Sequence, residues 1–377
     1  MANVVESIVA FNANIKVYIV TRSDWRTEHY DELMSRFEKN VEIVTFDSDL
    51  DGAWIKTLSI REWSKVLEVI HRLLQRIAPF AVIFMALDDY LVPFIFRVFR
   101  AKQILGTLKV FTIKYRVQYL LKRTPKYSHP RNVLLRLFTL FSLRMVRSEL
   151  ICFDERFDSN IFKRTKIHVI PDPWFGDFSK TYREIARTNL SICSSDFVLA
   201  TIGRQDRRKG FPLLLENLHI LLAQPSFKLL VVGAIATEFK EKFEELKILG
   251  GNRIVHIDRF VSDSELKQYF SAADLYLLAY SLDFTSSSGT LVRAAASGVP
   301  LLACSHGLVG HRVSSNHIGV CFDVTNNDSM VAALNSFRSS SDISNQNVKS
   351  NLANFADKNS ISKFSESVSS AIFNARR

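Results

Sequence analysis

Residues 197–222, FVLATIGRQDRRKGFPLLLENLHILL, contain the pattern that decides the fold. The short apolar run Phe197–Ile202 predicts a buried strand, and Leu213–Leu222 has the composition of a helix. The two are joined by a short loop that contains Gly203 and several cations. A buried strand that leads through a tight loop into a helix is the repeating unit of parallel α/β sheets.

The same alternation of strands and helices extends along most of the chain. Further strands are predicted at Ile15–Thr21, Val41–Phe46, Phe80–Ala86, Leu108–Ile113, Glu149–Asp154, Lys228–Val232, Ile254–Ile257, Leu275–Ala279 and Leu301–Cys304. Further helices are predicted at Glu28–Glu38, Ile60–Ile77, Leu134–Arg147, Asp263–Ala272 and Leu291–Ser297. Ser262 and Glu265 have the spacing of a capping box before Asp263–Ala272. The fold class is therefore α/β, with parallel sheets covered by helices on both faces.

A break in the alternation predicts two domains. The segment Lys166–Trp174 contains two prolines and is followed by a polar connection. We predict two doubly wound, Rossmann-like domains, residues 1–180 and 181–360, that face each other across a cleft where the ligand binds. The tail from Ser339 onward is too polar for a core, except for a terminal helix at Ile361–Phe373. We expect residues 361–377 to complete the N-terminal domain, with Phe364, Val368 and Ile372 on one face of that helix.

The bulk composition indicates a globular protein of a reducing compartment. The chain has 377 residues, of which 47% are hydrophobic, and only 4 cysteines, none spaced as a metal or redox pair. The N-terminus lacks the basic region of a signal peptide. No uncharged apolar run reaches the length of a membrane span, since Arg136 interrupts the best candidate, Asn132–Leu143. We therefore expect a cytoplasmic protein.

The loop after Phe197–Ile202 is the first candidate site. Gly203 allows a ligand to approach the backbone. Arg204 and Lys209 lie five residues apart across a tight loop that enters a helix, so both cations can converge on one anion, such as a diphosphate. The alternative is a basic turn that is merely solvated.

A second candidate site is the hydroxyl-rich run Thr285-Ser286-Ser287-Ser288-Gly289-Thr290, which precedes a predicted helix. The exposed N–H groups of a helix N-terminus bind anions. The alternative is a simple N-cap, which needs only one of these hydroxyls. The helix then ends at Ser297-Gly298-Val299-Pro300, before the buried strand Leu301–Cys304.

Four blocks in this order and spacing resemble the donor-binding domain of the retaining glycosyltransferases of family 4, which have the GT-B architecture. They lie within residues 197–325 and read GRQDRRKGF, LLVVG, RIVHIDRFVSDSELKQYFSAADLYLLAYS and SSSGTLVRAAASGVPLLA. The segment VIPDPW resembles the part of the family that precedes the interdomain linker. The N-terminal half matches only in its alternation of strands and helices.

The resemblance implies roles for particular residues. Arg204 and Lys209 would hold the donor diphosphate and stabilise the departing charge, next to Gly203. Arg259 and Phe260 would line the nucleobase. Ser287, Ser288, Gly289 and Thr290 would bind the diphosphate and the sugar. Residues 1–180 would form the acceptor side and residues 181–360 the nucleotide-sugar side.

The chain departs from the family pattern at several positions. Thr285 and Arg293 occupy the positions of two glutamates, and Arg293 cannot accept a hydrogen bond from ribose, although it could point at phosphate. The glycine-rich loop after the first strand is replaced by residues 22–25, Arg-Ser-Asp-Trp. Lys114 stands where many members have a histidine. The roles of Lys114, Thr285 and Arg293 are left open by the sequence.

Other polar residues predict structure rather than chemistry. Asp88 and Asp89 end a predicted strand but lack a third metal ligand, so we interpret them as a capping or cleft-edge pair. Asp274 is expected to cap or pack. His168 and His256 are interpreted as structural, while His306 and His311 flank a short glycine-bearing segment and could face the cleft.

A second feature of the chain is its basic segment, residues 90–148. It contains thirteen Lys and Arg residues and no Asp or Glu, whereas the net charge of the whole chain is +11. Bulky apolar residues alternate with the cations. A basic amphipathic surface of this kind binds anionic lipid, and we predict an anionic membrane partner. A soluble anionic acceptor and a merely solvated face are the alternatives; no nucleic-acid module is present.

The resemblance implies transfer of a hexose, with retention, from a nucleotide diphosphate sugar to a polysaccharide or lipid-linked glycan. A UDP-sugar such as UDP-glucose is the expected donor, with no cofactor and no metal. A nucleotide-sugar 2-epimerase of the same architecture and a non-catalytic binding protein are the alternatives. The expected location is peripheral, on the inner face of the cell membrane.

Overall fold

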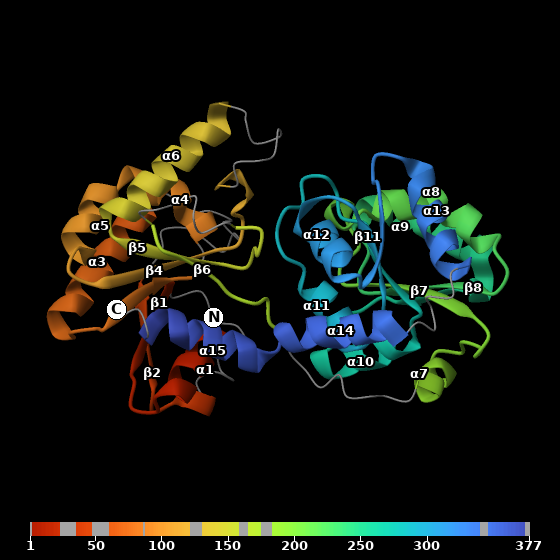
Figure 1. Cartoon of the computed structure of the whole chain (residues 1–377), viewed down its shortest axis with the longest axis horizontal. Coiled ribbons are helices and arrows are strands. Elements are labelled where there is room, and N and C mark those ends of the chain that lie inside the picture. The colour runs from red at the N-terminus through yellow and green to blue at the C-terminus, as the bar shows by residue number, and fades with distance from the viewer. Residues whose placement is uncertain are drawn as a thin grey trace. The chain divides into compact units, whose positions relative to one another are not determined.

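The computed structural model describes residues 2–22, 35–46, 60–85, 87–120, 130–157, 165–174, 183–339 and 346–373 (Figure 1). The chain forms two compact units. Unit 1 comprises Met1–Pro171 with Phe364–Arg377, and unit 2 comprises Asp172–Lys363. The predicted boundary at residues 180 and 181 lies outside the described residues, as do most of the predicted helix Glu28–Glu38, the loop 23–25 and the cations Lys122, Arg123 and Lys126.

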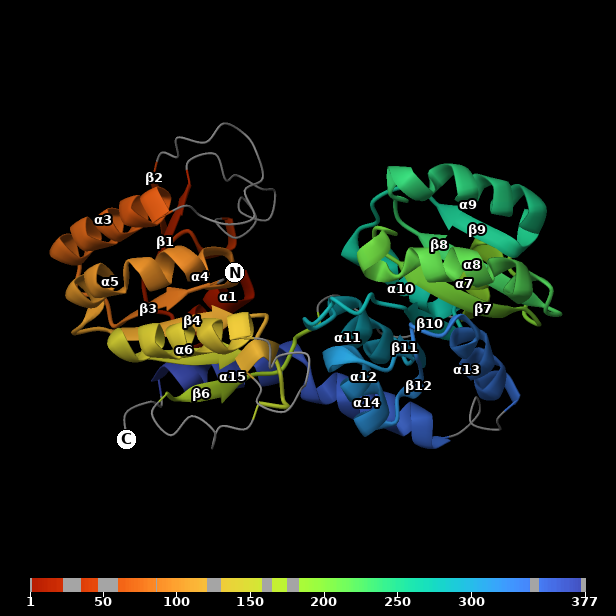
Figure 2. The ribbon, with the colours of Figure 1, turned by 90° about the horizontal axis from the view of Figure 1, so that it is seen from above.

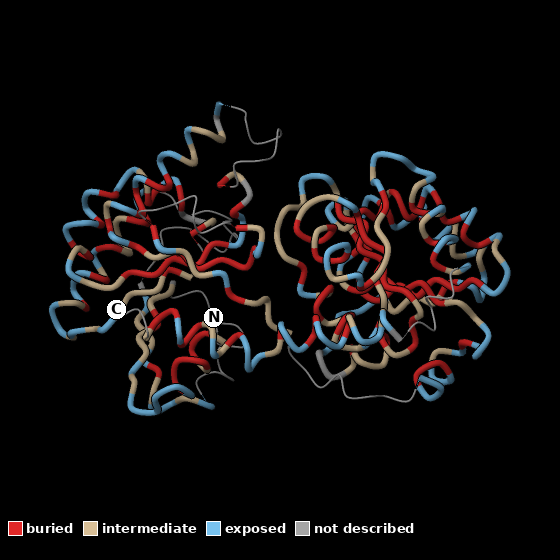
Figure 3. The backbone as a smooth tube through the Cα atoms, in the orientation of Figure 1, coloured by how far each residue is buried: buried red, intermediate tan, exposed pale blue. Residues whose placement is uncertain are grey.

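Unit 2 is built on a parallel six-stranded sheet of order β12-β11-β10-β7-β8-β9. Its strands are β7 (Phe197–Ile202), β8 (Phe227–Val232), β9 (Ile254–Ile257), β10 (Leu275–Leu278), β11 (Leu301–Cys304) and β12 (Gly319–Phe322). The strand predicted first, β7, lies between β10 and β8, in register with both. Its residues are buried from Val198 to Ile202 because helices cover both faces of the sheet (Figure 3).

The helices of unit 2 divide between the two faces of this sheet. One face is covered by α8 (Phe211–Leu222), α9 (Thr237–Gly250) and α13 (Asn327–Ser339). The other is covered by α7 (Arg183–Asn189), α10 (Asp263–Ala272), α11 (Gly289–Ala296), α12 (Gly307–Asn316) and α14 (Gln346–Lys358). Residues alternate between the two cores, since Val198 and Ala200 join one and Leu199 the other. The predicted doubly wound sheet is confirmed.

Local signals set several boundaries accurately. The predicted strands at β7, β9 and β11 and the predicted helix α10 have the observed limits. The capping box is confirmed, because Glu265 accepts a hydrogen bond from the Ser262 backbone N–H at 3.0 Å. The prediction that the tail before Ile361 is too polar for a core is wrong for α14. Leu352 and Phe355 of α14 are buried in the core beside α11, although most of their neighbours in the sequence are polar.

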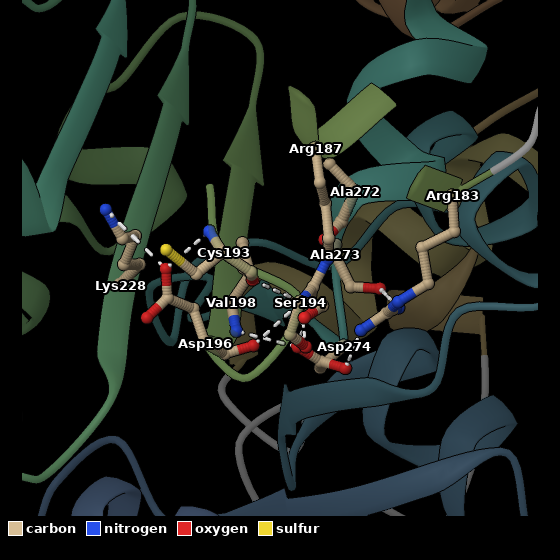
Figure 4. A network of polar contacts seen from close by, with 10 residues as sticks. All are labelled: Arg183, Arg187, Cys193, Ser194, Asp196, Val198, Lys228, Ala272, Ala273 and Asp274. Atoms are coloured by element: carbon tan, nitrogen blue, oxygen red, sulfur yellow. Dashed lines mark hydrogen bonds and ion pairs between the residues drawn. The ribbon is translucent and has the colours of Figure 1, made fainter. Parts of the chain in front are cut away.

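An ionic network fixes the amino end of β7 (Figure 4). The buried guanidinium of Arg187 on α7 donates to the carbonyls of Ala272, Cys193, Ser194 and Asp196, at 2.9 to 3.1 Å. The Asp274 carboxylate accepts from Arg187 at 2.6 Å and from the Val198 backbone N–H at 2.8 Å. Asp274 therefore packs and caps, as predicted, and ties α7 and β10 to β7.

Unit 1 contains two parallel sheets, β1-β2 and β3-β4-β5-β6. Their strands are β1 (Val17–Arg22), β2 (Val41–Phe46), β3 (Ala81–Phe84), β4 (Lys109–Lys114), β5 (Ser148–Cys152) and β6 (Ile167–Val169). One face of the four-stranded sheet packs against α3 (Ile60–Arg76), α4 (Leu87–Phe96), α5 (Val98–Leu105) and α6 (Pro130–Met145) (Figure 2).

The opposite face of this sheet packs against the two ends of the chain. Val4 and Ile8 come from α1 (Ala2–Phe11), a helix that the sequence reading missed, and Phe364, Val368 and Ile372 come from α15 (Ile361–Phe373). The rings of Phe11 and Phe373 stack with centroids 4.4 Å apart. The predicted apolar face of the terminal helix is therefore buried, and residues far apart in the sequence share one core.

Candidate functional site

The loop that follows β7 begins where the backbone at Gly203 lies close to the backbone at Gly233. Gly203 has φ of 101° and Gly233, at the end of β8, has φ of 118°. A Cβ on Gly233 would lie 2.5 Å from the Gly203 carbonyl oxygen. Both positions therefore favour glycine for their conformation, and Gly233 also needs it for space.

Gln205 braces this loop from within. Its side-chain Nε2 donates to the Gly203 carbonyl at 2.6 Å, and its Oε1 accepts from the Thr201 hydroxyl at 3.1 Å. Its backbone N–H donates to the Ala234 carbonyl at 2.9 Å. Gln205 is almost fully buried. The turn is thus held before any ligand arrives.

The next turn sets the position of Lys209. Residues Arg207–Lys209 form one turn of 3-10 helix, capped by Asp206, whose carboxylate accepts from the Lys209 backbone N–H at 2.9 Å. Gly210 has φ of 72°, and a Cβ there would lie 1.7 Å from the Ala279 carbonyl oxygen. The chain is therefore pressed against the end of β10, which only glycine allows.

The side chain of Lys209 turns back over the carboxyl end of the sheet. Its Nζ donates to the Ile202 carbonyl at 3.1 Å and lies 5.4 Å from the centre of the Tyr280 ring. Burial disfavours the charge, but the phenol oxygens of Tyr276 and Tyr280 outweigh it, and the pKa of Lys209 is raised. Lys209 is therefore a half-buried cation at neutral pH.

Arg204 provides a second cation at the same loop. It follows Gly203 directly, and its side chain is exposed. Among the described residues no hydrogen-bond or ion-pair partner of its guanidinium is found. A guanidinium that is free of protein partners can bind an oxyanion with paired hydrogen bonds.

Tyr280 connects Lys209 to the N-terminus of α11. Its hydroxyl lies 2.9 Å from Ser288 Oγ, which caps α11 and lies 3.1 Å from Thr290 Oγ1. Burial disfavours the phenolate, but Lys209 and Ser288 outweigh it, and the pKa of Tyr280 is lowered. The structure therefore brings together a cation, a phenol and a capped helix N-terminus, where exposed N–H groups favour anions.

The remaining predicted residues fall in two groups. Ser287 and Gly289 flank Ser288 at the start of α11, and Arg293 lies half-buried one turn further along the helix. Arg259 is instead engaged with Glu265, where its Nη1 lies 3.2 Å from Oε2, and Phe260 beside it is 92% exposed. Arg259 therefore forms a local pair at the start of α10, and its contact with a nucleobase stays a prediction.

The two tyrosines of this site were missed by the sequence reading. Tyr276 donates to the Ile202 carbonyl at 3.2 Å, beside the bond from Lys209. Tyr280 stacks on Phe284 with ring centroids 3.8 Å apart. The available signal was the position of Tyr280, immediately after the predicted strand Leu275–Ala279, where side chains reach the carboxyl edge of a sheet.

Lys114 in unit 1 forms a buried ion pair with Asp88. Asp88 also accepts a hydrogen bond from the Tyr115 backbone N–H at 2.7 Å. The Lys114 ammonium lies 5.1 Å from the centre of the Tyr119 ring. Asp88 is therefore an anchor for the segment after β4, which extends its predicted capping role, while the Asp89 side chain lies outside the described residues.

The histidines are held by neighbouring groups. His168 Nε2 lies 2.5 Å from Glu149, and His256 Nε2 lies 3.3 Å from the Gly233 carbonyl. His306 Nε2 lies 3.0 Å from the Ser281 carbonyl, and His306 is the residue before α12. The structural interpretation of His168 and His256 agrees with these contacts.

Comparison with known proteins identifies the domain. Residues 183–355 match the family described as "Glycosyl transferases group 1". A stretch of 157 residues is 30% identical to mannosylfructose-phosphate synthase from Agrobacterium fabrum. This stretch covers 38% of the present chain and 34% of that enzyme, so it spans about a third of the relative's length.

Solved structures show the same fold over nearly the whole chain. Anabaena Alr3699/HepE in complex with UDP has a TM-score of 0.66 at 12% identity, with 96% of this chain and 100% of that chain covered. Sucrose-phosphate synthase from Thermosynechococcus elongatus has a TM-score of 0.67 at 13% identity, with 99% and 91% covered. WaaG, a glycosyltransferase of lipopolysaccharide biosynthesis, has a TM-score of 0.61 at 15% identity, with 98% and 94% covered.

These likenesses agree with the sequence blocks and with the parallel sheets. Residues 183–355 therefore form a domain that matches the group 1 glycosyl transferases, and the fold is the GT-B fold of the glycosyltransferases among these solved structures.

Proposed function

We propose that the protein transfers a hexose, with retention, from a nucleotide diphosphate sugar to a polysaccharide or lipid-linked glycan. The observation that carries this proposal is the placement of Lys209 beside Tyr280 and the N-terminus of α11, with Arg204 on the same loop. This arrangement concentrates positive charge and N–H donors where β7 and β10 end. A departing diphosphate needs such an environment.

The chemistry of the transfer is stabilisation of developing charge. As the bond between the sugar and the diphosphate breaks, negative charge grows on the leaving phosphate. Lys209 and Arg204 would bind that charge, and the hydroxyls and N–H groups of Ser287–Thr290 would add hydrogen bonds. Gly203 would allow the phosphates to approach the backbone. No metal is required in this scheme.

A uridine diphosphate donor is the most specific part of the proposal. Structures of Alr3699/HepE contain UDP, UDP with glucose, and UDP-glucose. Arg259 and Phe260 would line the base, and Arg293 would contact the donor phosphates or ribose. The identity of the sugar is to be tested directly, because the similarity to those structures establishes the fold alone.

We propose that the N-terminal, acceptor-side half of the chain binds an anionic membrane surface. We place the protein on the inner face of the cell membrane. Within the part of the chain that the structure describes, no helix has the length and apolar character to cross a membrane. Contact would instead be peripheral, through residues 90–148. The exposed cations of this segment include Arg97, Arg100 and Lys102, whereas Lys114 is buried and paired with Asp88.

Calorimetry with UDP, GDP, ADP and their hexose conjugates tests donor binding, with the Arg204→Ala variant as the site control. We expect UDP to bind and this variant to bind it on the order of tenfold to a hundredfold more weakly. Absence of binding to every nucleotide would contradict the proposal.

Turnover of the donor separates the alternatives. A transferase forms a glycosylated product with acceptor present, and NMR of the anomeric proton reports retention. A 2-epimerase would convert the donor without acceptor, and a non-catalytic binding protein would do neither. Turnover that persists in EDTA is expected; its loss, followed by recovery with a divalent ion, would contradict the metal-free scheme.

A further inference from the structure

Helix α6 turns an apolar stripe outward. Leu134, Leu137, Phe138 and Phe141 are all about half exposed, and their spacing places them on one side of the helix. Phe99 of α5 is exposed beside them, with its ring 6.5 Å from that of Phe141. An amphipathic helix normally buries its apolar stripe, so this face is suited to an apolar partner.

A basic cavity of about 450 Å³ opens at the C-terminal end of the same helix. It is lined by the end of α6, the start of β5 and the residues that lead into β6, and it includes Arg144, Arg147 and Lys166. Arg144 and Arg147 are exposed, and the described residues offer their guanidinium groups no ion pair. Arg144 follows Phe141 by three residues, so the apolar stripe leads directly to this cavity.

The carboxylate in the cavity is already neutralised. Glu149 lies 3.5 Å from the Lys166 ammonium and 2.5 Å from His168 Nε2. The two guanidinium groups are therefore left without a counter-charge. The partial negative charge at the end of α6 attracts a cation, but two arginines exceed what a helix end needs.

Thr165, which lines the same cavity, has a buried hydroxyl without a hydrogen-bond partner in the described part of the chain. Thr165 is 6% exposed, and its Oγ1 has no hydrogen-bond partner among the described residues. A buried polar group without a partner is costly and calls for explanation. A ligand that both accepts hydrogen bonds and carries negative charge would satisfy Thr165 and the two arginines together.

We propose that this cavity binds the headgroup phosphate of an acidic phospholipid, while the apolar stripe of α6 enters the acyl region. The inference deepens the proposed membrane contact: it rests on that contact and assigns it to particular residues. In this proposal the phosphate binds Arg144, Arg147 and the Thr165 hydroxyl. The apolar stripe adds buried apolar area, because ionic contact with one headgroup does not by itself hold a protein on a membrane.

Cosedimentation with vesicles of phosphatidylglycerol and phosphatidylcholine tests the site. The R144Q/R147Q double variant should bind about 30-fold more weakly. Each cation near the headgroups contributes about 1 kcal/mol of binding free energy, so losing two costs about 2 kcal/mol, which corresponds to this factor. Thr165→Val removes only a hydroxyl and changes no charge, and it should weaken binding about tenfold without lowering the melting temperature. A general electrostatic attraction would leave this variant unchanged.

Two controls match these changes. K240Q/K242Q removes equal charge from exposed positions on α9 in unit 2 and should bind vesicles normally. Thr139→Val alters a buried threonine of α6 whose hydroxyl already donates to the Leu135 carbonyl at 2.7 Å, so it should lower the melting temperature and leave vesicle binding intact.

The outcomes distinguish a lipid headgroup from a small free phosphate as the ligand. They also distinguish the lipid site from the proposed transferase site. Inorganic phosphate and glycerol phosphate at millimolar concentration should not displace the protein from vesicles; if they do, the cavity is a site for small anions and the lipid assignment is wrong. Equal vesicle binding by the wild type, R144Q/R147Q and Thr165→Val also overturns it. UDP affinity, measured on the same samples, reports the proposed transferase site independently.

Discussion

Replacing Lys209 by methionine is the most direct test of the donor site. The substitution keeps the length of the apolar stem and removes the charge. No carboxylate of the described residues pairs with the Lys209 ammonium, which is held by the Ile202 carbonyl and lies over the Tyr280 ring. Its charge is therefore available to a ligand, and losing one charge-assisted phosphate contact costs about 2–3 kcal/mol. UDP should bind roughly 30- to 150-fold more weakly.

Isothermal calorimetry with UDP and with uridine separates the phosphate contact from the base contact. The affinity for uridine should stay unchanged, because the lysine lies at the proposed phosphate position. Lys242→Met on α9 is the matched control, since it removes an exposed cation of the same unit. The reasoning is refuted if Lys209→Met binds UDP within about twofold of the wild type while its melting temperature is unchanged.

Three further predictions concern stability and the start of α11. Arg187→Met should destabilise unit 2 by about 3–5 kcal/mol in urea unfolding, because it leaves the Asp274 carboxylate and several carbonyls without their donor. The control is Arg183→Met, because the half-exposed Arg183 side chain pairs with the same Asp274. This control should cost at most about 1 kcal/mol. The Arg259 guanidinium and the Ser262 N–H lower the pKa of Glu265 from 4.5 to about 2. This carboxylate therefore stabilises the fold above pH 4.5, and its contribution is lost as the pH falls toward 2. The unfolding midpoints of the wild type and Glu265→Gln should converge over that range. Arg293→Glu should weaken UDP binding about tenfold with an unchanged melting temperature, and an unaltered dissociation constant would place Arg293 outside the donor site.

The sequence alone determined the regular elements of unit 2 and the loop that carries Lys209. Strands such as β9 and β11 are short apolar runs, and α10 begins with a capping box, so their limits depend on neighbouring residues. The position of Arg204 and Lys209 on one loop follows from their spacing, and their convergence on one anion stays a prediction. These features are local, and local patterns are what a sequence displays.

Only the tertiary structure decided which distant groups meet. Tyr280 and Ser288 reach Lys209 because β10 lies beside β7, and Lys114 pairs with Asp88 because β4 lies beside β3. Thr165 and Arg144 line one cavity for the same reason. A polar helix such as α14 enters the core through Leu352 and Phe355. Such contacts depend on strand order and packing between segments far apart in the chain, which no periodicity or spacing within a single segment records.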